Sequence, residues 1–216
     1  NAQDMMITAA FDGPLAGGTP KGVEIYVIND IADLSVCGFG TPTDGGASAG
    51  EEFTFPAVSA SAGDYIYISI ASTEFRNWFG FDADYTSGTA SVNGDDPMEL
   101  FQNGSVIDVY GVVGQDGTGQ VWDYMDGWAY RNDCSTPNST FLSSDWTISG
   151  IDALDGETSN ATAASPIPVG TYNCSVTPSD LPSVSFASST GSKMENDATN
   201  DTIWVNLSKV AIQTDT

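Results

Sequence analysis

The sequence predicts an all-β protein built on an antiparallel β-sandwich. Glycine (23 residues), proline (10 residues) and frequent Ser, Thr, Asn and Asp interrupt any 3.6-residue apolar period, so the only helix expected is one short turn within 73–79. Short apolar segments recur instead, with turn residues between them, as in an antiparallel sandwich. Asn103-Gly104 lies between two of these segments and is typical of a type I′ hairpin turn.

The first expected strand, 5–11, ends at a turn formed by Asp12-Gly13-Pro14. The later strands are expected at 23–28, 36–39, 52–55, 65–70, 98–101, 106–110, 128–131 and 146–148. A loop is expected over 150–168. A Pro-flanked linker at 178–182 then separates a first domain, 1–177, from a partial second one, 183–216.

The charge balance is strongly acidic. Five Lys and Arg residues oppose 29 Asp and Glu residues, for a formal net charge of −24. Nucleic acid and anionic membranes are bound through Lys and Arg, so neither is an expected partner. No apolar run approaches the ~20 residues that a membrane helix requires.

Histidine is absent, which removes the commonest general base and metal ligand and all Ser-His-Asp or Cys-His arrangements. Paired carboxylates remain the main enzymatic route, and their spacing here does not indicate a cleft. The sequence therefore predicts a protein that is not an enzyme.

Three cysteines are present. Cys134 and Cys174 stand in polar, loop-like contexts and are the expected disulfide pair in an oxidising compartment, whereas Cys37 lies on an apolar segment and is expected to be a buried free thiol. The sequence begins with Asn1-Ala2-Gln3, which resembles a new N-terminus left after signal-peptide cleavage. Together these features predict an extracellular or cell-surface protein.

Residues 3–173 resemble the lamin-tail domain of bacterial extracellular proteins. The resemblance rests on Ile7-Thr8 with Asp12-Gly13-Pro14, on the segments 21–29, 93–100 and 106–111, and on Asp126-Gly127-Trp128-Ala129-Tyr130-Arg131. It implies an immunoglobulin-like β-sandwich without catalytic residues of its own.

The tail resembles the first two strands of a Calx-beta domain, another immunoglobulin-like sandwich that is often adhesive and calcium-binding. The resemblance rests on 182–188 and on Ile203-Trp204-Val205-Asn206-Leu207-Ser208. The later strands of that family and their acidic ligands do not follow, so the resemblance does not supply a calcium site.

A calcium site is nevertheless a candidate elsewhere in the chain. Asp116, within Gln-Asp-Gly-Thr-Gly, lies near Asp123 and Asp126, and carboxylate oxygens are the ligands that Ca²⁺ prefers. The segment lacks the spacing of an EF-hand loop, so a solvated turn is the alternative reading.

Aromatic residues alternate at period two, at Trp122 and Tyr124, Trp128 and Tyr130, Phe53 and Phe55, and Tyr65 and Tyr67. Such pairs lie on one face of a strand, where they form either the sandwich core or a platform for stacking sugars.

Six sites fit Asn-X-Ser/Thr, the acceptor for N-linked glycans on exported proteins. They are Asn103, Asn138, Asn160, Asn173, Asn200 and Asn206. Thr202, within Asp-Thr-Ile, resembles a bacterial O-glycosylation signal.

The tail segment determines the functional hypothesis. Two strand signals cannot bury enough apolar surface to stand alone in water, so the apolar residues Ile203, Trp204, Val205 and Leu207 are expected to pair with sheet supplied from elsewhere. Either the body of the same chain or a neighbouring copy would supply it, and donation to a neighbouring copy gives a head-to-tail filament unless a ring closes. The first strand, 5–11, is a second candidate donor. We therefore expect a secreted homopolymer, with glycans as a candidate decoration. The alternative is a carbohydrate- or calcium-binding adhesion module of a larger secreted protein, whose next domain begins with this tail.

Overall fold

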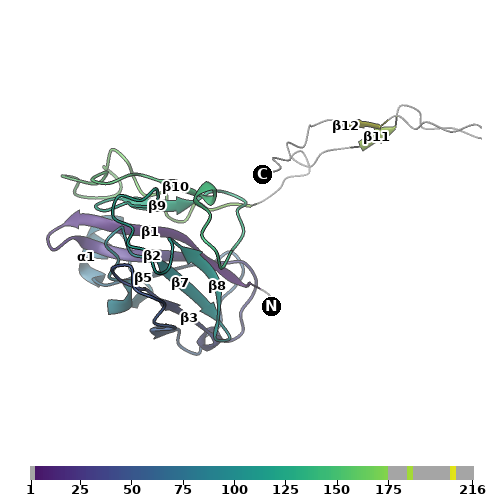
Figure 1. The fold of residues 1–216 in the computed structure, drawn as a ribbon, viewed down its shortest axis with the longest axis horizontal. Helices are drawn as coiled ribbons and strands as arrows, with labels where there is room; N and C mark the ends of the chain where they lie inside the picture. The colour runs from purple at the N-terminus through teal and green to yellow at the C-terminus, as the bar shows by residue number, and fades with distance from the viewer. Residues whose placement is uncertain (1–2, 175–183, 187–204, 208–216) are drawn as a thin grey trace, which may run out of the picture. The chain divides into compact units, whose positions relative to one another are not determined.

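The computed structural model describes residues 3–174, 184–186 and 205–207. The chain divides into two compact units, Asn1–Asn173 and Cys174–Thr216, so the first ends before the expected boundary at 177. The linker expected at 178–182 lies outside the described residues. The first unit is a β-sandwich of two mainly antiparallel sheets, which confirms the all-β prediction and is consistent with an immunoglobulin-like fold (Figure 1).

The larger sheet has the strand order β10-β9-β1-β2-β5-β6. Its neighbours are antiparallel except for β5 and β6, which are parallel. The strands are β1 (Met5–Leu15), β2 (Thr19–Val27), β5 (Tyr65–Ser69), β6 (Tyr85–Thr86), β9 (Trp128–Arg131) and β10 (Trp146–Ile148). The long β1–β2 hairpin therefore lies in the middle of this sheet (Figure 1).

The smaller sheet has the order β4-β3-β7-β8, all antiparallel. Its strands are β3 (Cys37–Gly40), β4 (Phe53–Thr54), β7 (Met98–Gln102) and β8 (Ser105–Tyr110). Asn103 and Gly104 join β7 to β8 with φ values of 51° and 72°, as the predicted type I′ turn requires.

One α-helix, α1 (Ser72–Phe79), occupies the segment where a short helical turn is expected. It ends where Gly80 adopts a φ of 83°, a conformation that glycine takes without a Cβ clash. Its buried residues are Phe75 and Trp78. Three 3₁₀ turns, at Leu34–Val36, Gly88–Ala90 and Ser143–Asp145, complete the regular elements of this unit.

Strand β1 is buried on both faces because two apolar clusters cover it. Met5 and Ile7 join the cluster between the sheets, whereas Met6 and Phe11 join a second cluster with Phe75 and Trp78 of α1. A register shift between Ile7 and Ala9 changes the alternation there, so Ala9 joins the second cluster and Ala10 the first.

Two expectations for this unit are wrong in detail. Asp12-Gly13-Pro14 is not a turn, since β1 continues through it to Leu15 with an irregular register after Asp12. Gly13 is required there because a Cβ would lie 2.5 Å from Pro20 on the paired strand β2. The strand β6 has no counterpart in the prediction, because two residues are too few to show an alternating apolar pattern.

In the second unit, the described residues form one two-stranded antiparallel ribbon. β11 (Val184–Phe186) pairs with β12 (Val205–Leu207), with Val184 opposite Leu207 and Phe186 opposite Val205. These are the two strand signals expected in the tail.

Candidate functional site

The structure does not bring together the three carboxylates predicted to bind calcium. Asp116 accepts a hydrogen bond from the Thr118 N–H (2.9 Å), and Asp123 accepts from the Gly119 and Met125 N–H groups (2.7 and 3.1 Å). Both carboxylates stabilise their own turns in this way. Hydrogen bonding to Thr118 also lowers the pKa of Asp116, so its charge is stabilised locally. For these residues the solvated-turn reading fits better than the calcium reading.

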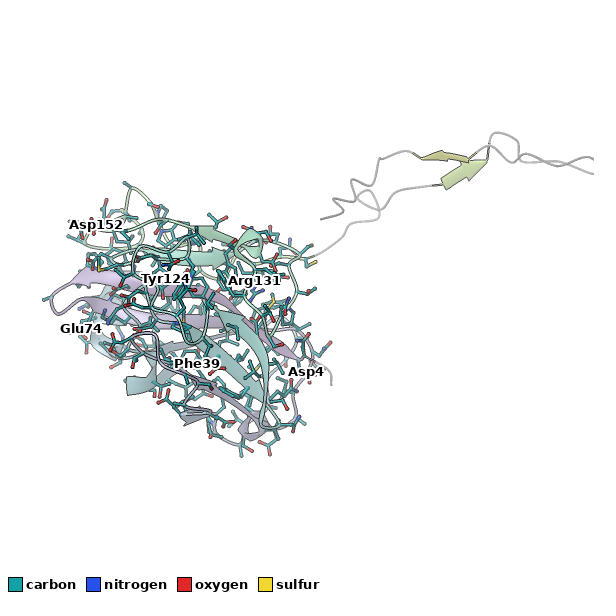
Figure 2. The ribbon with its side chains drawn as sticks, in the orientation of Figure 1. Asp4, Phe39, Glu74, Tyr124, Arg131 and Asp152 are labelled. Carbon is teal, nitrogen blue, oxygen red and sulfur yellow. The ribbon has the colours of Figure 1, made fainter. Side chains whose placement is uncertain are left out.

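Asp126 belongs to a different acidic group, with Asp152 and Asp155. Carboxylate oxygens of these three residues lie within 4.8 Å of one another, and among the described residues no other group of three potential ligands is this close. The Leu154 N–H donates to the Asp126 carbonyl (2.9 Å) and so holds the turn containing Asp152 and Asp155 in place. Figure 2 shows Asp152 on a peripheral loop of the domain.

This group is the place in the described chain where a divalent cation has three carboxylates available, although Ca²⁺ takes six to eight oxygens. Asp152 and Asp155 are exposed, and exposed acidic groups commonly lie together without an ion. Sequence spacing misses the group because more than twenty residues separate Asp126 from Asp152.

The cysteines have the expected arrangement. Cys37 is free and buried, and burial raises the pKa of its thiol to about 11, so it is an unreactive core residue. Cys134 and Cys174 are both disulfide-bonded, and in a chain with three cysteines they can only be partners of one another.

The candidate glycosylation sites differ in exposure. Asn103 and Asn173 are exposed, whereas Asn138 and Asn160 are half-buried. The side-chain amide of Asn160 bonds to Ile167 at both ends (2.9 and 2.8 Å), which fixes its orientation. Asn200 and Thr202 lie outside the described residues, and Asn206 lies in β12.

The expected assembly strand is described in part. Val205 and Leu207 belong to β12, while Ile203 and Trp204 lie outside the described residues. The second candidate donor, 5–11, is part of β1, which pairs with β2 on one side and, over Ala9–Phe11, with β9 on the other.

The sheet edges offer little free backbone for strand addition. Edge strands β4 and β6 have two residues each, and β10 has three. The longer edge strand β8 is covered in part. Its Val109 N–H donates to the Asn138 carbonyl (3.1 Å), and its Ile107 carbonyl accepts from the Gln3 side chain (2.7 Å). Among the described residues, the edges of both sheets therefore have few unpaired ladder positions.

The alternating aromatic pairs do not form a sugar platform. Trp122, Tyr124, Trp128 and Tyr130 are all buried. Figure 2 shows Tyr124 within the body of the domain. Phe53 and Phe55 pack on each other and on Tyr85 (ring centroids 5.3–5.8 Å apart). These residues lie in the core or pack against it, as do the half-buried Tyr65 and Tyr67, and this is the structural alternative of the two readings.

Glu24 is a buried carboxylate that the prediction misses. It accepts hydrogen bonds from the Thr8 hydroxyl (2.7 Å) and the Gly170 N–H (2.6 Å). Burial raises the pKa of Glu24, and hydrogen bonds, including those to Tyr67 and Tyr130, oppose the rise. The Tyr130 hydroxyl accepts from the Thr171 and Tyr172 N–H groups (3.0 and 2.7 Å). The side chains of Glu24 and Tyr130 therefore bind the 170–172 segment to the larger sheet, which is a structural role.

Asp108 and Arg131 form the second buried polar centre. The guanidinium donates to the carboxylate at 2.6 and 2.8 Å and to the Ile7 carbonyl at 2.7 Å, and it lies 4.5 Å from the Trp146 ring centre. Asp108 also accepts from the Ile7 and Asn138 N–H groups (both 2.8 Å). The carboxylate and the guanidinium are both taken up by these hydrogen bonds. The pair therefore joins β1, β8 and β9 and has a structural role.

None of the helices among the described residues is both long and apolar enough to cross a membrane. Comparisons with family models, with curated proteins and with solved structures give no match to this chain.

Proposed function

We propose that this protein is a secreted, non-enzymatic structural protein that assembles with copies of itself through its C-terminal segment. The polymer is extracellular, and the exposed Asn103 and Asn173 are where N-linked glycans would attach. The lamin-tail and Calx-beta resemblances are compatible with this proposal because both families include modules of extracellular proteins.

The observation that carries the proposal is the make-up of the second unit. Its described part is a ribbon of two three-residue strands, β11 and β12. A two-stranded ribbon is marginally stable in water, and it gains stability when a further apolar surface covers it. The sequence around β12 is rich in apolar residues, with Ile203 and Trp204 preceding it. Packing on a neighbouring copy would provide the missing cover.

The pairing of β1 in the sandwich is the reason why we assign the donor role to the tail. Because β1 is an internal strand, the N-terminal segment is not free to be donated, and the donating role falls to the tail. A tail that binds the sandwich of the next copy makes a heterologous contact, and repetition of such a contact gives a filament unless the rotation closes a ring.

The disulfide and the charge support the extracellular setting. Disulfides persist in oxidising compartments, and this protein has one between Cys134 and Cys174.

The net charge of −24 keeps individual copies apart in solution, so association requires a specific contact.

Electron microscopy of negatively stained full-length protein, and of a variant lacking residues 182–216, tests the proposal. The truncated chain retains Cys174 and the whole sandwich. We expect filaments or rings from the full-length protein and monomers from the truncated one. Identical polymers from both proteins, or monomers from both, would overturn the proposal.

A further inference from the structure

A groove lies on the outer face of the smaller sheet. It has a volume of about 270 Å³ and is lined mainly by Val106 and Val109 of β8, by Val112, and by Phe141. Glu99 of β7 stands opposite Val109 and also lines it. Met98 and Leu100 belong to the cluster between the sheets, so Glu99 lies on the opposite face of its strand.

Glu99 is an unusual lining residue for such an apolar groove. Its exposed fraction is 5%, and among the described residues its Oε2 atom has no hydrogen-bond partner. A buried carboxylate oxygen without a partner costs free energy, and a cationic donor removes that cost most effectively. The groove therefore fits a group that combines an apolar body with a positive charge.

Few cations in this chain are available to meet that charge. Lys21 contacts Asp12 (2.8 Å), Arg76 contacts Asp82, and Arg131 contacts Asp108. The other two basic residues of the sequence are Lys193 and Lys209, both in the second unit and outside the described residues. Lys209 lies between Ser208 and Val210, with Leu207, Ala211 and Ile212 close by in the sequence, whereas Lys193 lies between Ser192 and Met194 in a largely polar segment.

We propose that the groove of one copy receives the segment around Lys209 of a second copy. The Lys209 ammonium pairs with the Glu99 carboxylate, and the lysine stem and its apolar neighbours cover Val106, Val109 and Val112. This inference rests on the proposed function and names its acceptor site. It does not require a free edge on β8, because side chains on the face of the sheet make the contact.

Single substitutions in the full-length protein provide the first test. Glu99→Gln and Lys209→Ala should each raise the protein concentration at which assembly begins by about tenfold or more, since each leaves one partner of a buried charge pair unpaired. The matched controls Glu74→Gln, on α1, and Lys193→Ala, in the tail, should leave that concentration unchanged. Thermal melting of the monomers checks that Glu99→Gln still folds.

Charge reversal provides the second test and separates contacts between copies from contacts within one chain. Glu99→Lys alone and Lys209→Glu alone should each stay monomeric. A mixture of the two proteins should assemble, because each groove then meets an opposite charge on the other protein's tail. Lys209 belongs to the second unit, so the Lys209→Glu result is informative even if Glu99→Lys folds poorly.

The outcomes distinguish this inference from the proposed function. If Glu99→Gln or Lys209→Ala assembles like the wild type while the variant lacking 182–216 is monomeric, the tail binds elsewhere and the groove assignment is wrong. If the mixture fails and only the double variant that carries both Glu99→Lys and Lys209→Glu recovers assembly, the contact is intramolecular and the inference is overturned. If the truncated chain polymerises, the proposed function fails as well.

Discussion

At the scale of single residues, the interior of the sandwich depends on charge pairing as well as apolar packing. Arg131 and Asp108 are 2% and 0% exposed, and their hydrogen bonds reach Ile7 in β1 and Asn138 in the loop before β10. Figure 2 shows Arg131 within the body of the domain. The pair is held in place because each charged group keeps several partners after losing water.

We expect Arg131→Met to destabilise the domain by about 3–5 kcal/mol, because Asp108 then remains buried without a cation. Arg76→Met is the matched control. The Arg76–Asp82 pair is exposed, so its loss should change the free energy of unfolding by less than about 1 kcal/mol. Urea unfolding measures both values, and equal effects of the two substitutions would contradict this account of the core.

Residue roles were predictable from the sequence where local context decides them. Cys37 lies in an apolar strand and is buried and free, as expected. The grouping of Asp126 with Asp152 and Asp155 was not predictable, because a tertiary contact between two loops creates it. The burial of Glu24 was missed for the same reason, since the distant segment around Gly170 covers it.

At the scale of elements, close approach between strands explains particular glycines. A Cβ at Gly22 would lie 2.3 Å from the Ile68 carbonyl oxygen on β5 and 2.8 Å from the Phe11 ring on β1. The backbone of β2 therefore has no room for a side chain at this position, and the pairing of β2 with β5 depends on its absence.

Gly22→Ala should destabilise the domain by about 2 kcal/mol or more, because backbone atoms must move to relieve the clash. Gly88→Ala is the matched control. Nothing lies within 4 Å of its Cβ position, and its φ is not in the left-handed region, so its effect should lie within about 1 kcal/mol of zero. Thermal melting of both variants measures the difference. A Gly22→Ala protein as stable as the wild type would show that β2 and β5 are not packed as described.

Elements with strong local signals were predicted well. The Asn103-Gly104 hairpin and strands β9 and β10 occur where the sequence places them. The extension of β1 through Gly13 was not predicted, since Gly and Pro locally indicate a turn and only the contact with Pro20 explains an extended Gly13. The role of β1 as an internal strand likewise depends on its pairing with β9, which is more than one hundred residues away in the sequence.

At the scale of the whole molecule, buried carboxyl groups couple stability to pH. Burial raises the pKa of Asp108 to about 6, and it raises the pKa values of Glu24, Asp12 and Asp96 above their ordinary range. Between the ordinary values near 4 and these raised values, the folded state binds more protons than the unfolded state. Stability therefore falls as the pH rises through this window.

We expect the melting temperature of the truncated domain to be higher at pH 5 than at pH 7.5. Lower net charge acts in the same direction by reducing self-repulsion, so the comparison should be repeated at high salt, which screens the surface charges more than the buried ones. A melting temperature that falls on acidification to pH 5 would contradict the raised pKa values.

The partner surface of the tail has the least local basis in sequence. The tail resembles a domain opening, and its two strand signals correspond to β11 and β12. In the proposed assembly the surface that covers them belongs to another molecule, and no pattern within one chain specifies such a contact. Charge complementarity between Glu99 and Lys209 is the feature that suggests an acceptor.

Sedimentation velocity of the full-length protein over a dilution series, beside the variant lacking 182–216, tests the central claim most directly. The account predicts a concentration-dependent series of species larger than a monomer for the full-length chain and a single monomeric species for the truncated chain. A full-length protein that sediments as a monomer at every concentration, or a truncated protein that still forms the larger species, would contradict assembly through the tail.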